Sequence, residues 1–563
     1  MSISIDYKIK TYLTKNSLII MTPAQKLTGF TLYSGNIYQI TTTRIPETIE
    51  RNGTELTLVG SIGAVDDTTK YYYDSGIVYV YLPSTDYFTL FFNMYFGDRG
   101  FKLPKDLDLT GSAEVVYFEP RIKGNPGFSR TQKDKMQGIS LVADADFQLI
   151  DTNEEYFESL GDLVENRDYS FFEKDVKIYR FLGEESVQEV HKVFSGQVYD
   201  WSVDRQKVSF RAKDFVRLLN KSVQTAEYNI TDYPNCDPAF VGRIIRQIYG
   251  ECMVKCVNID YEDDNPTTSD NRVWKISEHP NYAVDEVWVR ETKLTETTHY
   301  TLNGDKNEIT FVSNLETLLG WTDLLQGAEE VYTLVRGKMD GSSNLMDNAS
   351  DIVKDILTTI GFSSSGLDLT SFSDAKTANN YEIAFSMPQY VDGERPTAKE
   401  VIEKINASVL GFLSMDNDFL IRYDIYSEGS SDINLDADYD LQNRIRSAET
   451  PDMASMIIVN FNFNEKRDTS RSKTVTDDDA LYLHKTSNSH TIESVLLLEA
   501  EAEDLGEDYI DYYKHPAIFE NFTVKLQIDD KKSGDFIEVD GNKCELIQLS
   551  KSINDTGVSA RRV

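Results

Sequence analysis

Hydrophobic and polar residues alternate with a period of two along much of this chain. Two clear runs lie at residues 76–82 and 285–290. Because successive side chains of a strand point to opposite faces of a sheet, this alternation predicts strands with one buried face. Such runs outnumber the helical patterns. We therefore expect a mainly β protein with α+β insertions, made of several small antiparallel β-barrel or sandwich domains with docked helices.

Short turn sequences separate the predicted strands. Gly, Asn and Asp tolerate the positive φ angles that tight hairpins need. The sequence places these residue types at Asn52-Gly53, Asp74-Ser75-Gly76, Asn303-Gly304-Asp305 and Asp540-Gly541-Asn542. Their positions indicate antiparallel hairpins between consecutive strands.

The clearest helical pattern runs from Asp237 to Gly250. Asp237 suits the N-cap, Pro238 suits the first helical position, and Gly250 suits the position after the last turn. Apolar residues recur between them at helical spacing: Phe240, Val241, Ile244, Ile245 and Ile248. We expect a helix at 238–249 whose apolar stripe docks on a sheet.

Two further helices have recognisable ends. One should begin at residue 350 or 351 and stop at Gly361, because glycine is favoured just after a helix. The other opens with Thr397-Ala398-Lys399-Glu400, a capping box in which the hydroxyl and the carboxylate each satisfy a free backbone N–H. A strand hairpin is expected next, at 411–421.

A fourth, acidic helix is expected between about Thr491 and Tyr513. Seven carboxylates and no base lie between residues 497 and 511. Gly506 is a candidate break, because glycine weakens a helix interior. We expect these carboxylates mainly to keep the protein soluble.

The overall charge narrows the classes of function. The chain has 563 residues, with 93 Asp and Glu against 57 Lys and Arg, and a net charge of −36. A surface that neutralises DNA phosphates needs the opposite balance, so nucleic-acid recognition is disfavoured.

No stretch approaches the roughly 18 apolar residues of a spanning helix, and the first residues lack the pattern of a secretory signal. We expect no membrane-spanning segment.

The common catalytic signatures are absent from the sequence. It holds no phosphate-binding glycine loop, no dinucleotide fingerprint, no zinc-protease motif and no nucleophile elbow. Structural or surface roles are expected for the six widely spaced histidines, His191, His279, His299, His484, His490 and His515. We predict no catalytic, cofactor-binding or metal-binding residues, no cofactor, and no enzymatic activity.

Three weaker chemical patterns do not support a site. The alternating acids from Asp436 to Asp440 lack the glycine and final glutamate of a calcium loop. Adjacent acids such as Glu184-Glu185 and Asp263-Asp264 do not supply the opposed carboxylates of a glycosidase. Cys252 and Cys256, on one face of a predicted strand, are expected to pack as reduced thiols, and the remaining two cysteines, Cys236 and Cys544, are too few for a disulfide framework.

Several short segments follow one another in a distinctive order: 114–121, 125–129, 138–147, 176–179, Phe194-Ser195-Gly196-Gln197-Val198, 208–214, 218–220, Asp232-Tyr233-Pro234-Asn235, 411–421, 534–539 and 546–550. This order resembles that of the hub domains in tail-tip and baseplate proteins of tailed bacteriophages. The resemblance covers roughly residues 115–563, and the first 115 residues lie outside it.

The resemblance and the breaks in the pattern together suggest five domains. They are an N-terminal strand-rich domain at 1–120, a hub-like β-barrel domain with the helix 238–249 at 121–265, an inserted β module at 266–340, an α+β domain at 341–440, and a C-terminal β domain with the acidic helix at 441–563.

The resemblance implies a structural virion protein of the phage tail, assembled in the bacterial host cytoplasm. It implies a homotrimeric hub whose duplicated barrels meet a hexameric tail tube, with tip, spike or fibre proteins on the other face. DNA would pass only transiently through its channel, and acidic side chains lining that channel would repel it. The resemblance carries over no site residue.

A glycan-binding or glycan-cleaving surface protein remains the alternative. Such a protein is also rich in strands and tyrosine, because aromatic faces stack on sugar rings. A pocket with opposed carboxylates would favour this alternative, and a ring-shaped particle would favour the hub.

Overall fold

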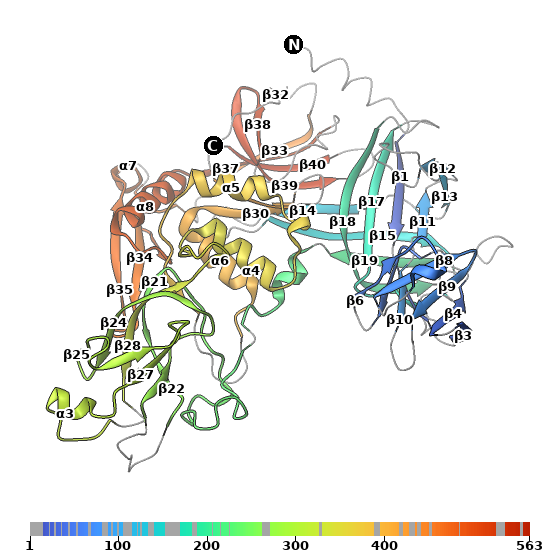
Figure 1. Cartoon of the computed structure of the whole chain (residues 1–563). Helices are drawn as coiled ribbons and strands as arrows, with labels where there is room; N and C mark the ends of the chain where they lie inside the picture. The colour runs from blue at the N-terminus through green and yellow to red at the C-terminus, as the bar shows by residue number, and fades with distance from the viewer. Residues whose placement is uncertain are drawn as a thin grey trace.

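The computed structural model describes residues 15–562 with gaps, the longest at 105–114, 133–139, 152–160, 162–168, 262–270, 388–394, 427–433 and 525–534. The protein is mainly β, with a few helices, as predicted (Figure 1). In the part of the chain that the structure describes, the sheets are open, and no closed barrel is present.

One large sheet runs through the molecule and combines strands from both ends of the chain. In order across the sheet, its main path is β12 (Phe101–Pro104), β13 (Val115–Pro120), β11 (Met94–Gly97), β1 (Lys15–Met21), β17 (Asp175–Leu182), β18 (Glu189–Asp204), β19 (Lys207–Lys213), β15 (Ser140–Ile150), β14 (Gly127–Gln132), β39 (Asn542–Lys551), β40 (Thr556–Arg562), β37 (Ala517–Val524) and β33 (Leu441–Glu449). Two shorter strands, β38 (Phe536–Val539) and β32 (Asn434–Leu435), extend it beside β39.

The large sheet has two separate hydrophobic cores. Along β19, buried Val208, Phe210 and Ala212 alternate with more exposed residues and join a core shared with β15, β17 and β18. A second core lies under β33, β37, β39 and β40 and includes Phe522 and Leu546. The period-two pattern thus produced strands with one buried face, as expected.

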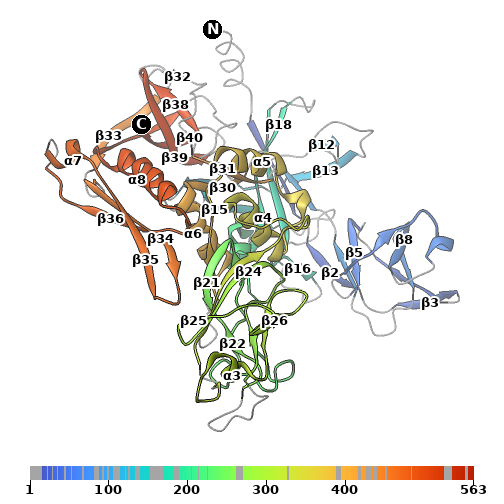
Figure 2. The ribbon, with the colours of Figure 1, turned by 60° about the vertical axis from the view of Figure 1, so that its left-hand side comes forward.

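The N-terminal segment adds two smaller sheets around a core of their own. Their strands are β16 (Tyr169–Ser170), β2 (Ala24–Leu27), β10 (Phe88–Phe91), β5 (Thr48–Arg51) and β6 (Thr54–Glu55) in one, and β3 (Thr31–Ser34), β4 (Ile37–Thr41), β9 (Ile77–Tyr81), β8 (Lys70–Asp74) and β7 (Thr57–Leu58) in the other. The blue strands from β2 to β10 form a lobe on the opposite side of the molecule from the C-terminal sheets (Figures 1 and 2).

A central layer of helices packs on strands from the second half of the chain. It contains α4 (Ala349–Thr359), α5 (Leu369–Ala378), α6 (Ala398–Val409) and α8 (Glu499–Tyr513), with the hairpin β30 (Gly411–Met415) and β31 (Ile421–Ile425). The helix predicted from residue 350 or 351 to Gly361, the helix predicted to open at Thr397 and the predicted hairpin at 411–421 are confirmed. In the capping box, Thr397 Oγ1 accepts from Glu400 N at 3.2 Å, and Thr397 N donates to Glu400 Oε2 at 2.8 Å.

The acidic helix is shorter than predicted, and Gly506 does not break it. Residues 489–493 form β36 (Ser489–Glu493) instead of a helical turn. Gly506 lies inside α8, where a Cβ atom would meet Val475 Cγ2 at 2.7 Å. The glycine therefore lets the helix pack closely on the sheet below it. Lys473 pairs with Glu503 at 2.9 Å, so part of the acidic run binds the protein's own surface.

A module at the lower end of the molecule in Figure 1 consists of two sheets. One contains β25 (Thr292–Lys293), β24 (Asn281–Val289), β28 (Val331–Lys338) and β21 (Glu251–Lys255), followed by β34 (Met456–Asn464) and β35 (Thr469–Thr476), with β36 also paired to β34. The other contains β22 (Val257–Asn258), β23 (Val273–Lys275), β27 (Glu308–Phe311) and β26 (Tyr300–Leu302).

Short elements complete the described chain: η1 (Ile62–Ala64), η3 (Phe215–Asn220), α3 (Leu315–Leu319), η4 (Ser364–Gly366), α7 (Asp478–Tyr482), and the pair β20 (Ile248–Tyr249) and β29 (Phe385–Ser386).

The predicted helix at 238–249 is wrong. Asp237 does accept from Ala239 N at 2.9 Å, but only turns follow. The backbone N–H groups that would continue a helix bond to distant segments, since Ile245 N donates to Ala226 O at 3.0 Å and Ile248 belongs to β20. Ile244 and Ile245 are buried, whereas Val241 is 43% exposed, so tertiary contacts have overridden the helical stripe.

Strand pairing crosses several of the proposed domain boundaries. β1 pairs with β17, β14 pairs with β39, and β21 pairs with both β28 and β34. The five sequence ranges therefore stay a proposal for folding units, and the sheets join these ranges into larger bodies.

Candidate functional site

The first candidate site lies where the two-sheet module at the lower end of Figure 1 meets the helical layer. A buried ion pair anchors this site. Arg246 Nη1 donates to Glu465 Oε2 at 2.6 Å, and Arg246 Nη2 donates to Glu465 Oε1 at 3.2 Å. The Arg246 side chain is only 4% exposed and that of Glu465 is 31% exposed. Burial alone would lower the pKa of the arginine, but Glu465 raises it above its ordinary value. Arg246 is therefore a fixed buried cation.

Further hydrogen bonds hold this ion pair in place. Lys255 N donates to Glu465 Oε2 at 2.8 Å, and Arg246 Nη1 also donates to Ser386 Oγ at 3.2 Å. The pair thus connects three segments that are far apart in sequence: the start of the module, β29, and the turn after β34.

A pocket with a volume of about 410 Å³ opens beside the ion pair, and we name it the junction pocket. Aromatic and aliphatic side chains form part of its wall, and four cations and one carboxylate form the rest. Its lining residues are Phe240, Arg243, Arg246, Cys252, Met253, Lys255, Ala384, Phe385, Ser386, Lys404, Phe463, Glu465, Ser494 and Val495. Such a volume suits a small ligand or a short peptide.

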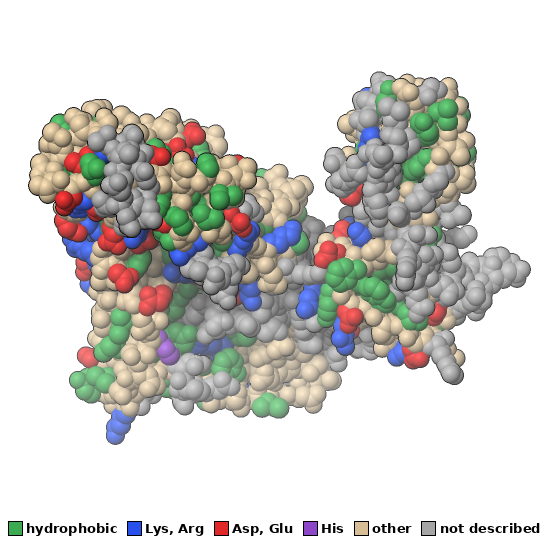
Figure 3. Space-filling view, turned by 90° about the horizontal axis from the view of Figure 1, so that it is seen from below, with side chains coloured by type: hydrophobic (Ala, Val, Ile, Leu, Met, Phe, Trp, Pro, Cys, Tyr) green, Lys and Arg blue, Asp and Glu red, His purple; other side chains and the backbone are tan. Residues whose placement is uncertain are grey.

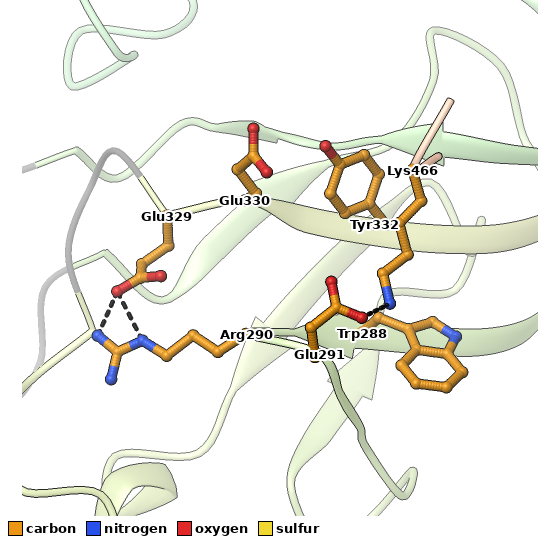
Figure 4. A pocket seen from close by; sticks show the side chains of 7 residues that line it. All are labelled: Trp288, Arg290, Glu291, Glu329, Glu330, Tyr332 and Lys466. Atoms are coloured by element: carbon orange, nitrogen blue, oxygen red, sulfur yellow. Dashed lines mark hydrogen bonds and ion pairs between the residues drawn. The ribbon is translucent and has the colours of Figure 1, made fainter. Parts of the chain in front are cut away.

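A second pocket, of about 370 Å³, lies on the module at the end of β24 (Figure 4). Arg290 Nε donates to Glu329 Oε1 at 2.7 Å on one side, and Lys466 Nζ donates to Glu291 Oε2 at 2.7 Å on the other. The Lys466 ammonium also lies 4.1 Å from the centre of the Trp288 ring. The charges of this second pocket are therefore largely engaged with one another.

The backbone beside the second pocket is unusual. Arg290 and Glu291 form the turn between β24 and β25 with φ angles of 47° and 62°. Hairpin turns of this kind favour Asn and Gly, because other side chains are strained at positive φ. Both side chains are held by ion pairs across the pocket, Arg290 with Glu329 and Glu291 with Lys466.

The second pocket has three carboxylates, and one of them, Glu330, is unsuited to the role of a glycosidase acid. Its carboxylates are Glu291, Glu329 and Glu330. The hydrogen bond from Lys255 holds the pKa of Glu330 below its ordinary value, whereas a general acid needs a raised one. Elsewhere in the lining, burial raises the pKa of Tyr332 to about 12, and the hydrogen bond to Glu329 raises the pKa of Arg290.

The cysteines behave as predicted. All four are free and buried, and Cys252 and Cys256 belong to a core of the two-sheet module. Burial raises the pKa of Cys256 to about 12 and also raises that of Cys252. Such thiols are poor nucleophiles, because the reactive form is the thiolate.

Among the histidines, His279 has a clear structural role. Its Nε2 accepts from Ile248 N at 2.9 Å, and its Nδ1 lies 3.0 Å from Pro280 O. Burial lowers the pKa of His279 to about 4, so the ring is neutral at neutral pH. It helps to hold β20 against the module.

Several patterns weighed in the sequence fall outside the described residues: His484, Glu184-Glu185, Asp263-Asp264 and the acids at 436–440. Where residues are described, no three His, Cys, Asp or Glu side chains gather as a metal-binding group. Within the same part of the chain, no helix is long and apolar enough to cross a membrane.

On the surface seen from below, neither positive nor negative side chains dominate the described part (Figure 3). Acidic and basic side chains are interspersed with hydrophobic ones on the described part of this face (Figure 3). The junction pocket therefore differs from the chain as a whole, because its lining has an excess of three positive charges in a protein with a net charge of −36.

The sequence did not reveal either pocket. Arg246 and Glu465 are 219 positions apart, and no local pattern signals a pair at that separation. Trp288 stood out only as part of an alternating strand. The one available signal was the charged pair Arg290-Glu291 at a hairpin turn, where Asn-Gly is usual.

No family model matches the chain, and no curated protein matches it. Several solved structures do match the chain. The chain is similar to the 43 kDa tail protein of prophage MuSo2 from Shewanella oneidensis, with 9% identity and a TM-score of 0.35 over 80% of this chain and 95% of that one.

Two more tail proteins show the same level of similarity. The prophage tail protein gp18 from Listeria monocytogenes has 8% identity and a TM-score of 0.37, covering 80% of this chain and 91% of that one. A tail protein from Neisseria meningitidis has 6% identity and a TM-score of 0.35, covering 79% and 93%. The predicted resemblance to phage tail proteins is confirmed as a similarity, but at such low identities and TM-scores it establishes no function.

Proposed function

We propose that this chain is a structural virion protein of a phage tail tip or baseplate, acting as a hub between the tail tube and a distal tip, spike or fibre. One observation carries the proposal. Two groups of antiparallel strands, each with its own core, join edge to edge where Ser129 pairs with Ser550 and Arg130 with Leu549.

This arrangement suits a change of symmetry between neighbouring parts of a tail. In this proposal each strand group offers one face to the tube, so three copies offer six. A hexameric tube could then seat on a trimeric ring with each subunit meeting one strand group. The trimer, the neighbouring proteins and the DNA exit path are parts of the proposal.

The test is the size and shape of the purified full-length chain. Light scattering should give the mass of three copies, and negative-stain images should show rings with six similar outer densities. A monomer at all concentrations up to the micromolar range, with no ring, would overturn the hub.

We also propose that the protein has no hydrolase activity. The lowered pKa of Glu330 and the buried, protonated thiols support this. Incubation with host cell-wall and capsule polysaccharides should release no reducing sugar or peptide. Sustained release that a single carboxylate substitution abolishes would reveal a catalytic site.

One observation favours the alternative of glycan binding. Trp288 and Tyr332 line the second pocket (Figure 4), and aromatic faces stack on sugars. The Lys466 ammonium already occupies one face of the indole, so we rank glycan binding below the hub.

The acidic excess could serve DNA passage if part of it lines the channel of the trimer. The run from Glu499 to Asp511 is a poor candidate, because Lys473 engages two of its carboxylates. Replacing channel-facing carboxylates by Lys in assembled particles should slow DNA ejection. Unchanged ejection would leave solubility as the role of the acids.

A further inference from the structure

The junction pocket has two cations without a counter-ion among the residues that the structure describes. Arg246 is paired with Glu465, and Lys255 Nζ donates to Glu330 Oε1 at 2.9 Å. Arg243 and Lys404 make no ion pair with any described residue, although both line the pocket. Within the described part of the chain, two positive charges without an ion pair therefore line the same cavity.

The position of Arg243 is fixed even though its charge is not neutralised. It is half-buried, and its guanidinium lies 4.9 Å from the centre of the Phe240 ring. A cation held over an aromatic face has lost part of its conformational freedom before any ligand arrives. Binding an anion there costs less entropy than binding it to a free surface arginine.

The pocket also contains a buried donor that is not satisfied. Arg246 is nearly completely buried, and its Nε atom has no hydrogen-bond partner among the described residues. A buried polar group without a partner is costly, so a ligand oxygen that reached it would be stabilised.

Apolar side chains supply the other half of the chemistry. Phe463 is 55% exposed on β34, and Phe385 and Met253 are partly buried in the same wall. An exposed phenylalanine beside uncommitted cations is suited to a ligand with an anionic group next to an apolar group. A polyol phosphate would use the cations but would leave the aromatic wall uncovered.

We propose that the junction pocket binds an acidic peptide segment of another protein. A carboxylate of the segment lies between Arg243 and Lys404, and a neighbouring aromatic or aliphatic side chain packs on Phe463. This inference goes beyond the hub role and depends on the pocket alone. The absence of a ring would therefore contradict only the hub role, and the absence of peptide binding would contradict only this inference.

The test is a titration of the full-length protein with two capped tripeptides. One is acetyl-Asp-Phe-Glu-amide, and the other replaces its two acids with the uncharged amides Asn and Gln. Saturation-transfer NMR can follow binding at millimolar affinity. The acidic peptide should bind at least about fivefold more tightly than the amide peptide, and added salt should weaken it.

Variants identify the site. Arg243→Gln and Lys404→Gln should each weaken the acidic peptide about fivefold or more, which corresponds to the loss of one charged contact of about 1 kcal/mol. Lys354→Gln is the matched control, because Lys354 is an exposed lysine on α4 outside the pocket lining, and it should bind like the wild type. Unchanged thermal unfolding of all three variants excludes loss of the fold as the cause.

Three results would overturn the proposal: equal binding of the two peptides, unchanged binding by both pocket variants, or a loss of binding in Lys354→Gln equal to that in the pocket variants. Inorganic phosphate is the final probe. If phosphate alone displaces the peptide at equal concentration, the pocket recognises a small anion instead of an acidic peptide.

Discussion

The ion pair of Arg246 and Glu465 gives the sharpest prediction about how the module is attached. Glu465→Gln keeps the shape of the side chain and removes its charge, which leaves the Arg246 guanidinium buried without a counter-ion. Breaking a buried pair by removing one partner costs about 3 to 5 kcal/mol. We expect about 3 kcal/mol, because Glu465 is 31% exposed and water screens part of the charge.

Glu330 provides a matched control, because its partner Lys255 also donates its backbone N–H to Glu465. Glu330 pairs with Lys255 at 2.9 Å, but these side chains are 63% and 34% exposed. An exposed ion pair contributes roughly 0 to 1 kcal/mol, so Glu330→Gln should cost less than about 1 kcal/mol. The two substitutions have the same chemistry and differ in the burial of the cation.

Hydrogen exchange of the backbone amides in β21 is a suitable assay, because a chain with several cores need not unfold in one step. A loss of about 3 kcal/mol should speed exchange there by about a hundredfold, whereas Glu330→Gln should change it less than about fivefold. Adding Arg246→Met to Glu465→Gln should restore much of the protection by removing the unpaired charge. Equal effects of the two single variants, or no rescue in the double variant, would refute the reasoning.

Three shorter predictions concern the histidine, a glycine and the capping box. His279 has a folded-state pKa of about 4, below the roughly 6.5 of an unfolded histidine, so its contribution is present above pH 6.5 and is lost as the pH falls toward 4. The free energy of unfolding should fall by up to about 3 kcal/mol over that window, and His279→Gln should abolish this dependence in a pH series of unfolding curves. Gly250→Ala should cost several kcal/mol or prevent folding, because Gly250 has φ +63° and a Cβ atom would lie 1.9 Å from a backbone carbonyl oxygen; Gly304→Ala, with no heavy atom within 4 Å, is the control and should be nearly neutral in thermal unfolding. Thr397→Ala should cost about 1 kcal/mol in the same measurement, because it removes the hydrogen bond to Glu400 N, and an unchanged midpoint would contradict the importance of the cap.

The helix 238–249 shows why a good local pattern can fail. The cap, the proline and the apolar stripe were all present, and Gly250 does have a positive φ. However, Gly250 lies where the chain passes close to Ile383 and not at a helix end. The apolar residues are buried in separate cores, Ile245 in one and Ile248 in another. Local propensity is worth tenths of a kcal/mol per residue, whereas burying one such side chain is worth roughly 1.5 to 3 kcal/mol.

The sequence by itself determined the elements whose causes are local. Alternation predicted the strands, the hydroxyl and carboxylate of Thr397 and Glu400 predicted a helix start, and Asp540-Gly541-Asn542 predicted a hairpin. In the structure, Asp540 and Gly541 have φ angles of 51° and 73° between β38 and β39. Each of these features depends on residues within a few positions of one another, so a pattern can encode it.

Only the tertiary structure decided which distant segments meet. The seam between β14 and β39 joins residues more than 400 positions apart, and the junction pocket draws on the turn at Arg243, on α6 and on β34. Pairing partners in a sheet and counter-ions in a core are selected by the whole fold, because any of many strands or carboxylates could satisfy the same local chemistry. The kind of elements was therefore encoded locally, while the seam and the pocket arise from the contacts among them.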